Sequence, residues 1–298
     1  MIRYAVKRGV IMNKLEYLKI KSIIVKNFKK EQFFDEKTIY DIIEIIINHR
    51  KYKTMISDVN LISENAENRI SGAYSPIDKS IKIVLPHDQN NYFDYNTTVL
   101  HILLHELEHV GQHKKCLESK NSDLEKGLFD TCFKANNYLE QIQKKLYNNE
   151  INPNEYLLII EQMKFYQMYS EIVNTRCYEL LPTERQAEIN SFKYLIELLK
   201  NNYDEKYKDK FEMIKINYLI RNLMGYKSDG KKVVVPTYEL YRIILDFMNQ
   251  SENKDKYFEK FDSFSKSMTL DQRLYYGLNI SLDEYNNKKL EIGKYFVK

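Results

Sequence analysis

Four of the six histidines lie one helical turn apart, at His101, His105, His109 and His113. Residues four positions apart lie on the same side of a helix, so His105 and His109 can direct both imidazoles at one metal ion. Glu106 follows the first of them and lies within reach of a water held by that ion. This H-E-x-x-H spacing is typical of zinc sites in which the glutamate removes a proton from water.

The residues around this motif predict a buried helix over 99–113, with Asn96-Thr97 as its N-cap. Burying two imidazoles and a carboxylate costs free energy unless they have partners, and a metal ion supplies one. The alternative interpretation is a surface helix with a histidine stripe and no metal. His101 and His113 form no further pair with a glutamate in the equivalent place, so we expect them to be polar neighbours of the site.

A third ligand is expected because a catalytic zinc site usually has three protein ligands and one open position. Thr183 and Gln186 form a capping box, which predicts a helix over 184–202. Glu184 and Glu188 fall within the apolar stripe of that helix, where carboxylates need cations or donors. We expect Glu184 to be the third ligand and Glu188 to accept the outer N–H of a ligand histidine, or to be the alternative ligand. Acids that merely favour the first turn of a helix are the competing interpretation.

Taken together, the segment 103–110 and the later Glu184-x-x-Ala187-Glu188 resemble the gluzincin branch of zinc metallopeptidases. The strand and turn expected before the active-site helix are also similar to those of the small ImmA/IrrE-like peptidases. The resemblance covers residues 70–113 and 181–199 and implies a zincin-like core that hydrolyses a peptide or protein substrate. It implies that Zn2+ is held by His105, His109 and Glu184. It also implies that Glu106 is the general base and that Glu188 is the acid that orients a ligand histidine.

The fold class predicted is mainly α with a small β-sheet or hairpin (α+β), since glycine and proline are scarce and long periodic runs dominate. A hairpin is expected over 69–86, with a strand at 80–85 and Val233-Val234-Val235 as a later short strand. An edge strand of this hairpin, beside the helix that carries the motif, could bind an extended peptide by strand addition, or the hairpin could simply close the core. Further helices are expected at 13–30, 36–50, 122–147, 155–181, 208–224, 237–250 and 254–268.

The domain organisation that follows is a zincin-like catalytic domain over 1–202 with a helical insert at 114–181. Residues 203–298 would form a helical C-terminal extension, either separate or part of the same domain. The length of 298 residues suits one or two domains.

The composition limits the classes of partner and the cellular compartment that we expect for this protein. The net charge is +4 and the basic residues alternate with acidic ones, which argues against a nucleic-acid partner. No apolar run approaches the length of a membrane span. Three widely spaced cysteines without a CxxC pair indicate neither a thiolate zinc site nor a disulfide framework. We therefore expect a cytoplasmic zinc metallopeptidase. A non-catalytic zinc-containing regulatory or binding protein is the alternative.

Overall fold

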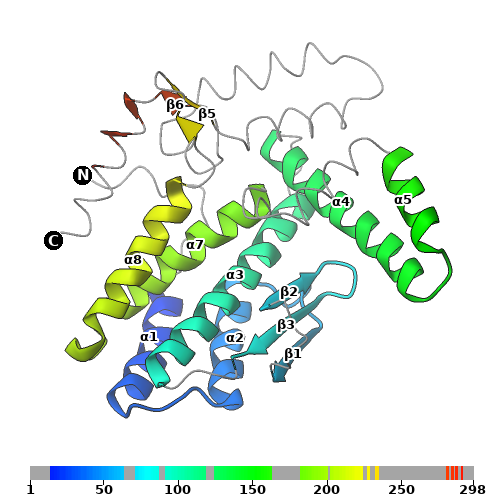
Figure 1. The fold of residues 1–298 in the computed structure, drawn as a ribbon. Coiled ribbons are helices and arrows are strands. Elements are labelled where there is room, and N and C mark those ends of the chain that lie inside the picture. The colour runs from blue at the N-terminus through cyan, green and yellow to red at the C-terminus, as the bar shows by residue number, and fades with distance from the viewer. Residues whose placement is uncertain are drawn as a thin grey trace. The chain divides into compact units, whose positions relative to one another are not determined.

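The computed structural model describes most of the first 223 residues and short pieces beyond them. These residues are 14–63, 71–86, 91–118, 124–162, 182–200, 202–223, 227–228, 232–234, 280–281, 283–284, 286–287 and 290. Helices predominate and a small mixed sheet accompanies them (Figure 1), which confirms the α+β prediction. Of the helices described, none is both long and apolar enough to cross a membrane.

The chain divides into two compact units. The first comprises Met1–Lys114, Ala187–Asn222 and Gly293–Lys298, and the second comprises Lys115–Gln186 and Leu223–Ile292. The predicted division into 1–202, with its insert at 114–181, and 203–298 stays a prediction.

The first unit contains a three-stranded sheet in the order β1-β3-β2. β2 (Gly72–Ser75) and β3 (Ser80–Leu85) form the predicted hairpin, with antiparallel pairs from Gly72↔Ile83 to Ser75↔Ser80. β1 (Asp58–Ser63) pairs in parallel with β3 and had not been predicted. Its apolar alternation is short, and parallel pairing leaves no adjacent turn that would mark the strand in the sequence.

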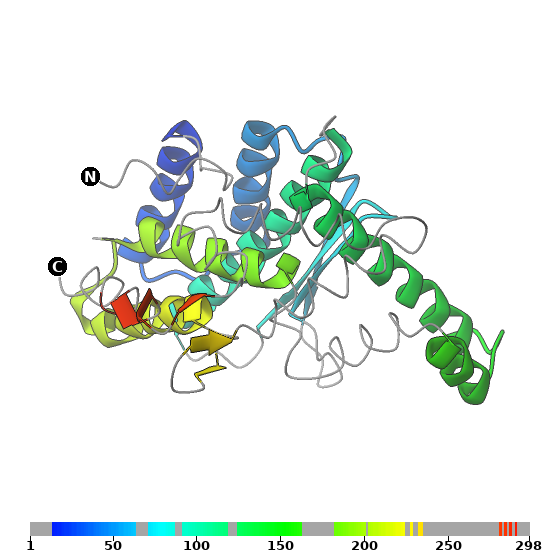
Figure 2. The same cartoon turned by 90° about the horizontal axis from the view of Figure 1, so that it is seen from above.

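Two helices precede the sheet and lie side by side, α1 (Lys14–Lys29) and α2 (Glu36–Arg50) (Figure 2). Both match the predicted ranges closely. Asp35 is the N-cap of α2, since its carboxylate accepts from the backbone N of Thr38 at 2.8 Å. Lys51 ends the helix in the left-handed conformation, with φ 57°.

The long helix α3 (Tyr92–Glu118) carries the H-E-x-x-H motif. It extends beyond the predicted 99–113 at both ends, and the predicted N-cap at Asn96-Thr97 was wrong. Asn91 precedes the helix and accepts from the backbone N of Asp94 at 2.9 Å. Asn96 lies inside the helix and is fully buried, because its amide satisfies the backbone of the loop before α2: it accepts from Phe34 N and donates to Gln32 O.

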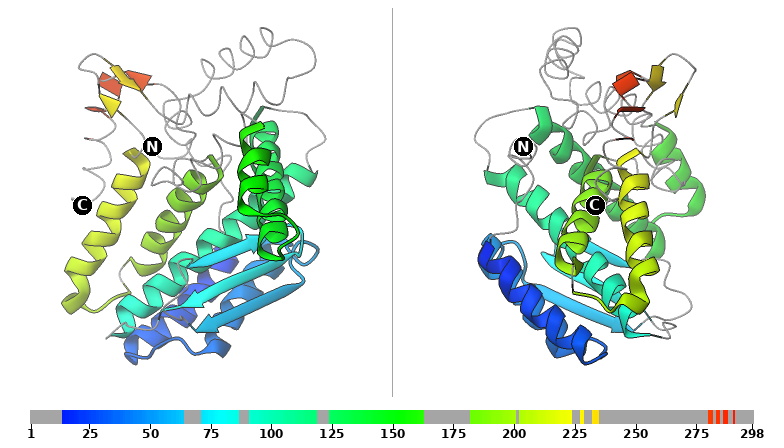
Figure 3. Two further views of the ribbon diagram at one scale, coloured as in Figure 1. Left: turned by 45° about the vertical axis from the view of Figure 1, so that its right-hand side comes forward. Right: turned by 90° about the vertical axis from the view of Figure 1, so that its left-hand side faces the viewer.

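The helix α7 (Pro182–Leu199) runs beside α3 (Figure 3). It begins at Pro182, so Thr183 lies inside the helix and the predicted cap was one to two residues late. The predicted apolar stripe is confirmed, because its members are all buried: Phe192, Leu195, Leu198 and Leu199. The three leucines of this stripe share one hydrophobic core with Ile81 and Ile83 of the sheet and with several leucines of α3.

In the first unit, a short 3-10 turn (Glu205–Tyr207) leads into α8 (Lys208–Leu223). The second unit contains α4 (Leu124–Tyr147) and α5 (Pro153–Gln162), close to the predicted starts. It also contains a small antiparallel sheet of β4 (Lys227–Ser228), β5 (Lys232–Val234) and β6 (Ile280–Ser281). The predicted helices at 237–250 and 254–268, and the part of 155–181 beyond Gln162, lie outside the described residues.

Candidate metal centre

The imidazoles of His105 and His109 meet on one side of α3, as their spacing predicts. Their Nε2 atoms are 3.1 Å apart, and the two rings stand nearly perpendicular, at 81°. His109 is buried and His105 is partly buried, so the pair is largely withdrawn from solvent. Both rings therefore direct the same nitrogen toward a common point.

The outer nitrogens of the rings face acceptors. The amide oxygen of Gln112 lies 2.9 Å from Nδ1 of His109. That oxygen can only accept, so the proton of His109 lies on Nδ1 and its Nε2 offers a lone pair. A carboxylate oxygen of Glu188 lies 3.5 Å from Nδ1 of His105, beyond hydrogen-bonding distance but close enough to favour a proton there.

With both outer nitrogens protonated, the inner lone pairs converge at 3.1 Å, an arrangement that a cation between them stabilises. Two nitrogens bound to tetrahedral zinc at about 2.0–2.1 Å are roughly 3.3 Å apart. The histidine pair thus fits a zinc ion with almost no rearrangement. A direct N–H···N bond between the rings would instead require one of them to move its proton away from its outer acceptor.

Glu184 joins the pair from α7. The boundary between the two compact units crosses α7 between Gln186 and Ala187, but the helix is continuous there. Ligand atoms of His105, His109 and Glu184 all lie within 4.8 Å of one another. Within the described ranges, this is the single group of three or more histidine, cysteine or acidic side chains placed to hold one ion. The structure brings the three predicted ligands together, and their binding of zinc stays a prediction.

Glu106, the predicted general base, is buried against the edge strand β2. A Cβ atom on Gly72 would lie 2.8 Å from its Oε1 and 3.0 Å from its Cγ. The absence of a side chain at Gly72 is therefore what allows the carboxylate to lie against the backbone of β2. The metal site and the strand meet at this residue.

Two further histidines are polar neighbours, as predicted. Nε2 of His101 lies 3.4 Å from the second carboxylate oxygen of Glu188, and its ring stacks on Phe192 at 4.1 Å. Nδ1 of His113 lies 2.9 Å from the hydroxyl of Tyr74 on β2. Burial raises the pKa of Tyr74, so its phenol stays neutral beside the imidazole, and the same hydroxyl also lies 3.4 Å from the carbonyl of Met55.

Three features of the surroundings had not been predicted: the acceptor Gln112, the contact of Gly72 with Glu106, and the burial of Glu108. Gln112 could have been found, because it lies three positions after His109 on the same helix. The other two depend on contacts with distant segments.

Comparisons with known proteins identify no relative. No family model, curated protein or solved structure matches the chain. Function is therefore inferred from the side chains of α3 and α7 and from the strand beside them.

Proposed function

We propose that this protein is a zinc metallopeptidase of the gluzincin type, built on a zincin-like core. The observation that carries the proposal is the convergence of the Nε2 atoms of His105 and His109 at 3.1 Å, with an acceptor behind the outer nitrogen of His109. The carboxylate of Glu184 completes a set of two nitrogens and one oxygen. Two histidines and a glutamate are an established ligand set of catalytic zinc.

His105, His109 and Glu184 would hold the ion, and Gln112 and Glu188 would keep the two imidazoles oriented. When bound, Zn2+ supplies Lewis acidity and lowers the pKa of a water toward neutrality. Glu106 accepts the proton of the attacking water at its carboxylate and then delivers it to the leaving amine. Burial of Glu106 excludes bulk water, which would otherwise compete for that proton.

The substrate in this proposal is a peptide in extended conformation. Within the described residues, β2 pairs with β3 alone, and in this proposal its other edge receives the substrate by strand addition. Gly72 of that strand contacts Glu106, so a segment added to β2 passes close to the proposed base. Main-chain hydrogen bonds to β2 would hold the substrate segment that contains the scissile bond, while the side chains of the substrate remain accessible to solvent.

The alternative is a regulatory or binding protein that keeps zinc without catalysis. The burial of Glu106 favours the peptidase, because a purely structural site gains nothing from an additional buried carboxylate.

The test begins with zinc content per chain, measured by elemental analysis on the parent, His109→Ala and Glu184→Ala. We expect about one zinc in the parent and clear loss in both variants. Hydrolysis of a fluorogenic peptide library is then measured with the parent and with Glu106→Gln. The Glu106→Gln variant should retain zinc and lose hydrolysis. Equal hydrolysis by both proteins would refute the mechanism, and zinc without any hydrolysis in the parent would favour the regulatory alternative.

A further inference from the structure

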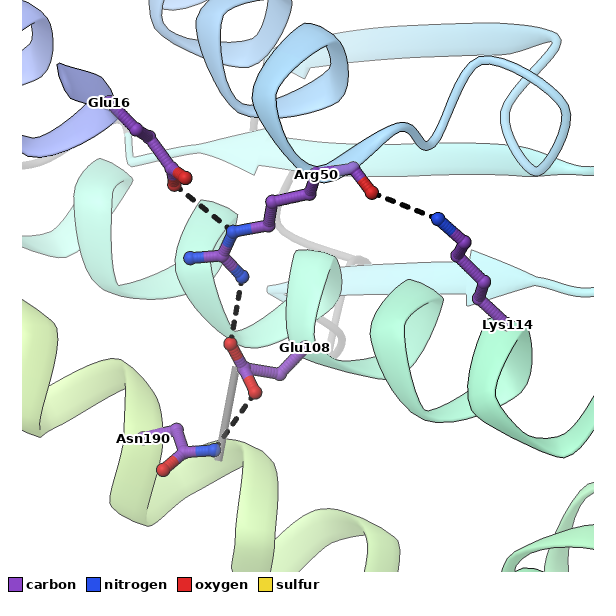
Figure 4. A network of polar contacts seen from close by, with 5 residues as sticks. All are labelled: Glu16, Arg50, Glu108, Lys114 and Asn190. Atoms are coloured by element: carbon purple, nitrogen blue, oxygen red, sulfur yellow. Dashed lines mark hydrogen bonds and ion pairs between the residues drawn. The ribbon is translucent and has the colours of Figure 1, made fainter. Parts of the chain in front are cut away.

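Glu108 belongs to the same motif as the ligands but serves neither the metal nor the base. It is 2% exposed, and each of its carboxylate oxygens has its own partner (Figure 4). Oε1 accepts from Nη1 of Arg50 at 2.9 Å, and Oε2 accepts from Nδ2 of Asn190 at 2.9 Å. One side chain of α3 is thereby bonded to both α2 and α7.

Arg50 provides the fixed end of this chain of contacts. Its Nε donates to Glu16 of α1 at 3.0 Å, and its guanidinium lies 5.3 Å from the ring centre of Tyr194. Burial alone would lower the pKa of Arg50, but Glu108, Tyr52, Tyr194 and Glu16 raise it well above its usual range. The guanidinium therefore stays charged and retains Glu108 as its partner.

A second contact fixes α3 against the end of α2. Nζ of Lys114 donates to the backbone carbonyl of Arg50 at 3.0 Å (Figure 4). It also donates to the backbone carbonyl of Lys51 at 3.1 Å. Glu108 and Lys114 lie six positions apart along α3, so α2 holds α3 at two points about 9 Å apart. Rotation of α3 about its own axis would break both contacts.

The bond to Asn190 extends this restraint to α7. Asn190 lies two positions after Glu188 and six after Glu184 in the same helix. A slip of one residue along a helix shifts a side chain by about 1.5 Å and turns it by about 100°. Such a slip would move Glu188 away from both histidines. Its carboxylate oxygens now lie 3.4 Å from Nε2 of His101 and 3.5 Å from Nδ1 of His105.

We propose that Glu108 and Asn190 are positioning residues, which hold α7 in register with α3 so that the acids of α7 face the histidines of α3. The proposal rests on the proposed function, because the geometry that it protects is that of the metal site. Neither residue touches the metal or the substrate. Their effect is carried by the placement of Glu184 and Glu188.

The test uses Co2+ as a spectroscopic probe bound to the full-length protein. Asn190→Ala removes the bond to Glu108 and leaves the pair of Glu108 with Arg50 intact. We expect its dissociation constant for Co2+ to rise about tenfold, as for other residues that orient metal ligands. The ligand-field spectrum should change as well, because the carboxylate from α7 no longer approaches the ion as in the parent.

Glu16→Gln is the matched control, since Glu16 also bonds to Arg50 but, among the described residues, has no hydrogen bond to α7 or to the histidines. It should lower stability while leaving the affinity and spectrum of Co2+ unchanged. The double variant Glu108→Gln with Asn190→Asp exchanges amide and carboxylate, retains a hydrogen bond between the two helices, and should recover affinity relative to Asn190→Ala.

The outcomes separate the two proposals. A parent that binds no Co2+ and no Zn2+ would contradict the proposed function and the positioning role with it. A parent that binds Co2+ with an Asn190→Ala variant of equal affinity and spectrum would overturn the positioning role alone. Equal loss of affinity in Asn190→Ala and Glu16→Gln would overturn it too, because the effect would then be one of general stability.

Discussion

Gly72→Ala adds one methyl group at the point where β2 meets the proposed base, and its effect can be derived from the structure. The new carbon would lie 2.8 Å from Oε1 of Glu106 and 2.8 Å from Cγ2 of Ile102. Carbon atoms in contact normally lie 3.5–4.0 Å apart, so Ile102 and its surroundings must yield by about 0.7 Å or more. The side chain of Glu106 must move by a similar amount.

A displacement of about 1 Å in a catalytic group costs on the order of 100-fold in rate, so we expect kcat to fall about 10- to 100-fold. This corresponds to roughly 1.4–2.7 kcal/mol of activation free energy. The free energy of unfolding should fall by about 1–3 kcal/mol, as for other overpacked sites. Metal content should be unchanged, because the Nε2 atoms of the two histidines lie on other side chains.

The assay compares hydrolysis of a fluorogenic peptide by the parent, Gly72→Ala and Ala73→Ser, each with its zinc content measured. Ala73 is the next residue of β2 and is exposed, so its variant controls for changes in the strand itself. Parental kcat in Gly72→Ala, at equal zinc content, would show that Glu106 is not the base or does not lie against β2.

Three further changes test other parts of the structure. Gln112→Leu removes the acceptor of His109, and competition with a chromophoric chelator should show a 10- to 100-fold weaker affinity for zinc. Asp35→Ala removes the N-cap of α2 and should cost about 1 kcal/mol in urea unfolding at pH 7. Hydrogen bonds from Thr38 lower the pKa of Asp35 below 3.8, so this difference should persist above that value and disappear as the pH falls through the lowered pKa. Leu103→Ala empties a fully buried position and should lower the free energy of unfolding by about 3 kcal/mol, and an unchanged urea midpoint would contradict the packing of α3.

The parts of the site that could be predicted are those that depend on local geometry. The pairing of His105 and His109 follows from a separation of four positions in a helix, whatever the helix packs against. The placement of Glu184 near the histidine pair could be predicted because two carboxylates lie within an apolar stripe, where they require partners. The hairpin of β2 and β3 was likewise marked by its own turn.

The parts that could not be predicted depend on contacts between distant segments. Gly72 precedes Glu106 by 34 positions, and Asn190 follows Glu108 by 82, so neither contact leaves a periodic signal. Asn96 shows the converse error: its residue type is typical of an N-cap, but its amide is bonded to a loop more than 60 positions earlier. Tertiary packing overrode the local preference there.

The long separation between α3 and α7 also bears on synthesis of the protein. Residues 115–186, 72 in all, are made between the first two segments of the first unit. At about 5–20 residues per second, synthesis of these residues takes roughly 4–14 s, and only afterwards is the apolar stripe of α7 made. During that interval Glu108 has Arg50 but lacks Asn190, and the leucines of α3 lack those of α7. The nascent chain thus carries an incomplete core, which makes this protein a candidate for chaperone binding during translation.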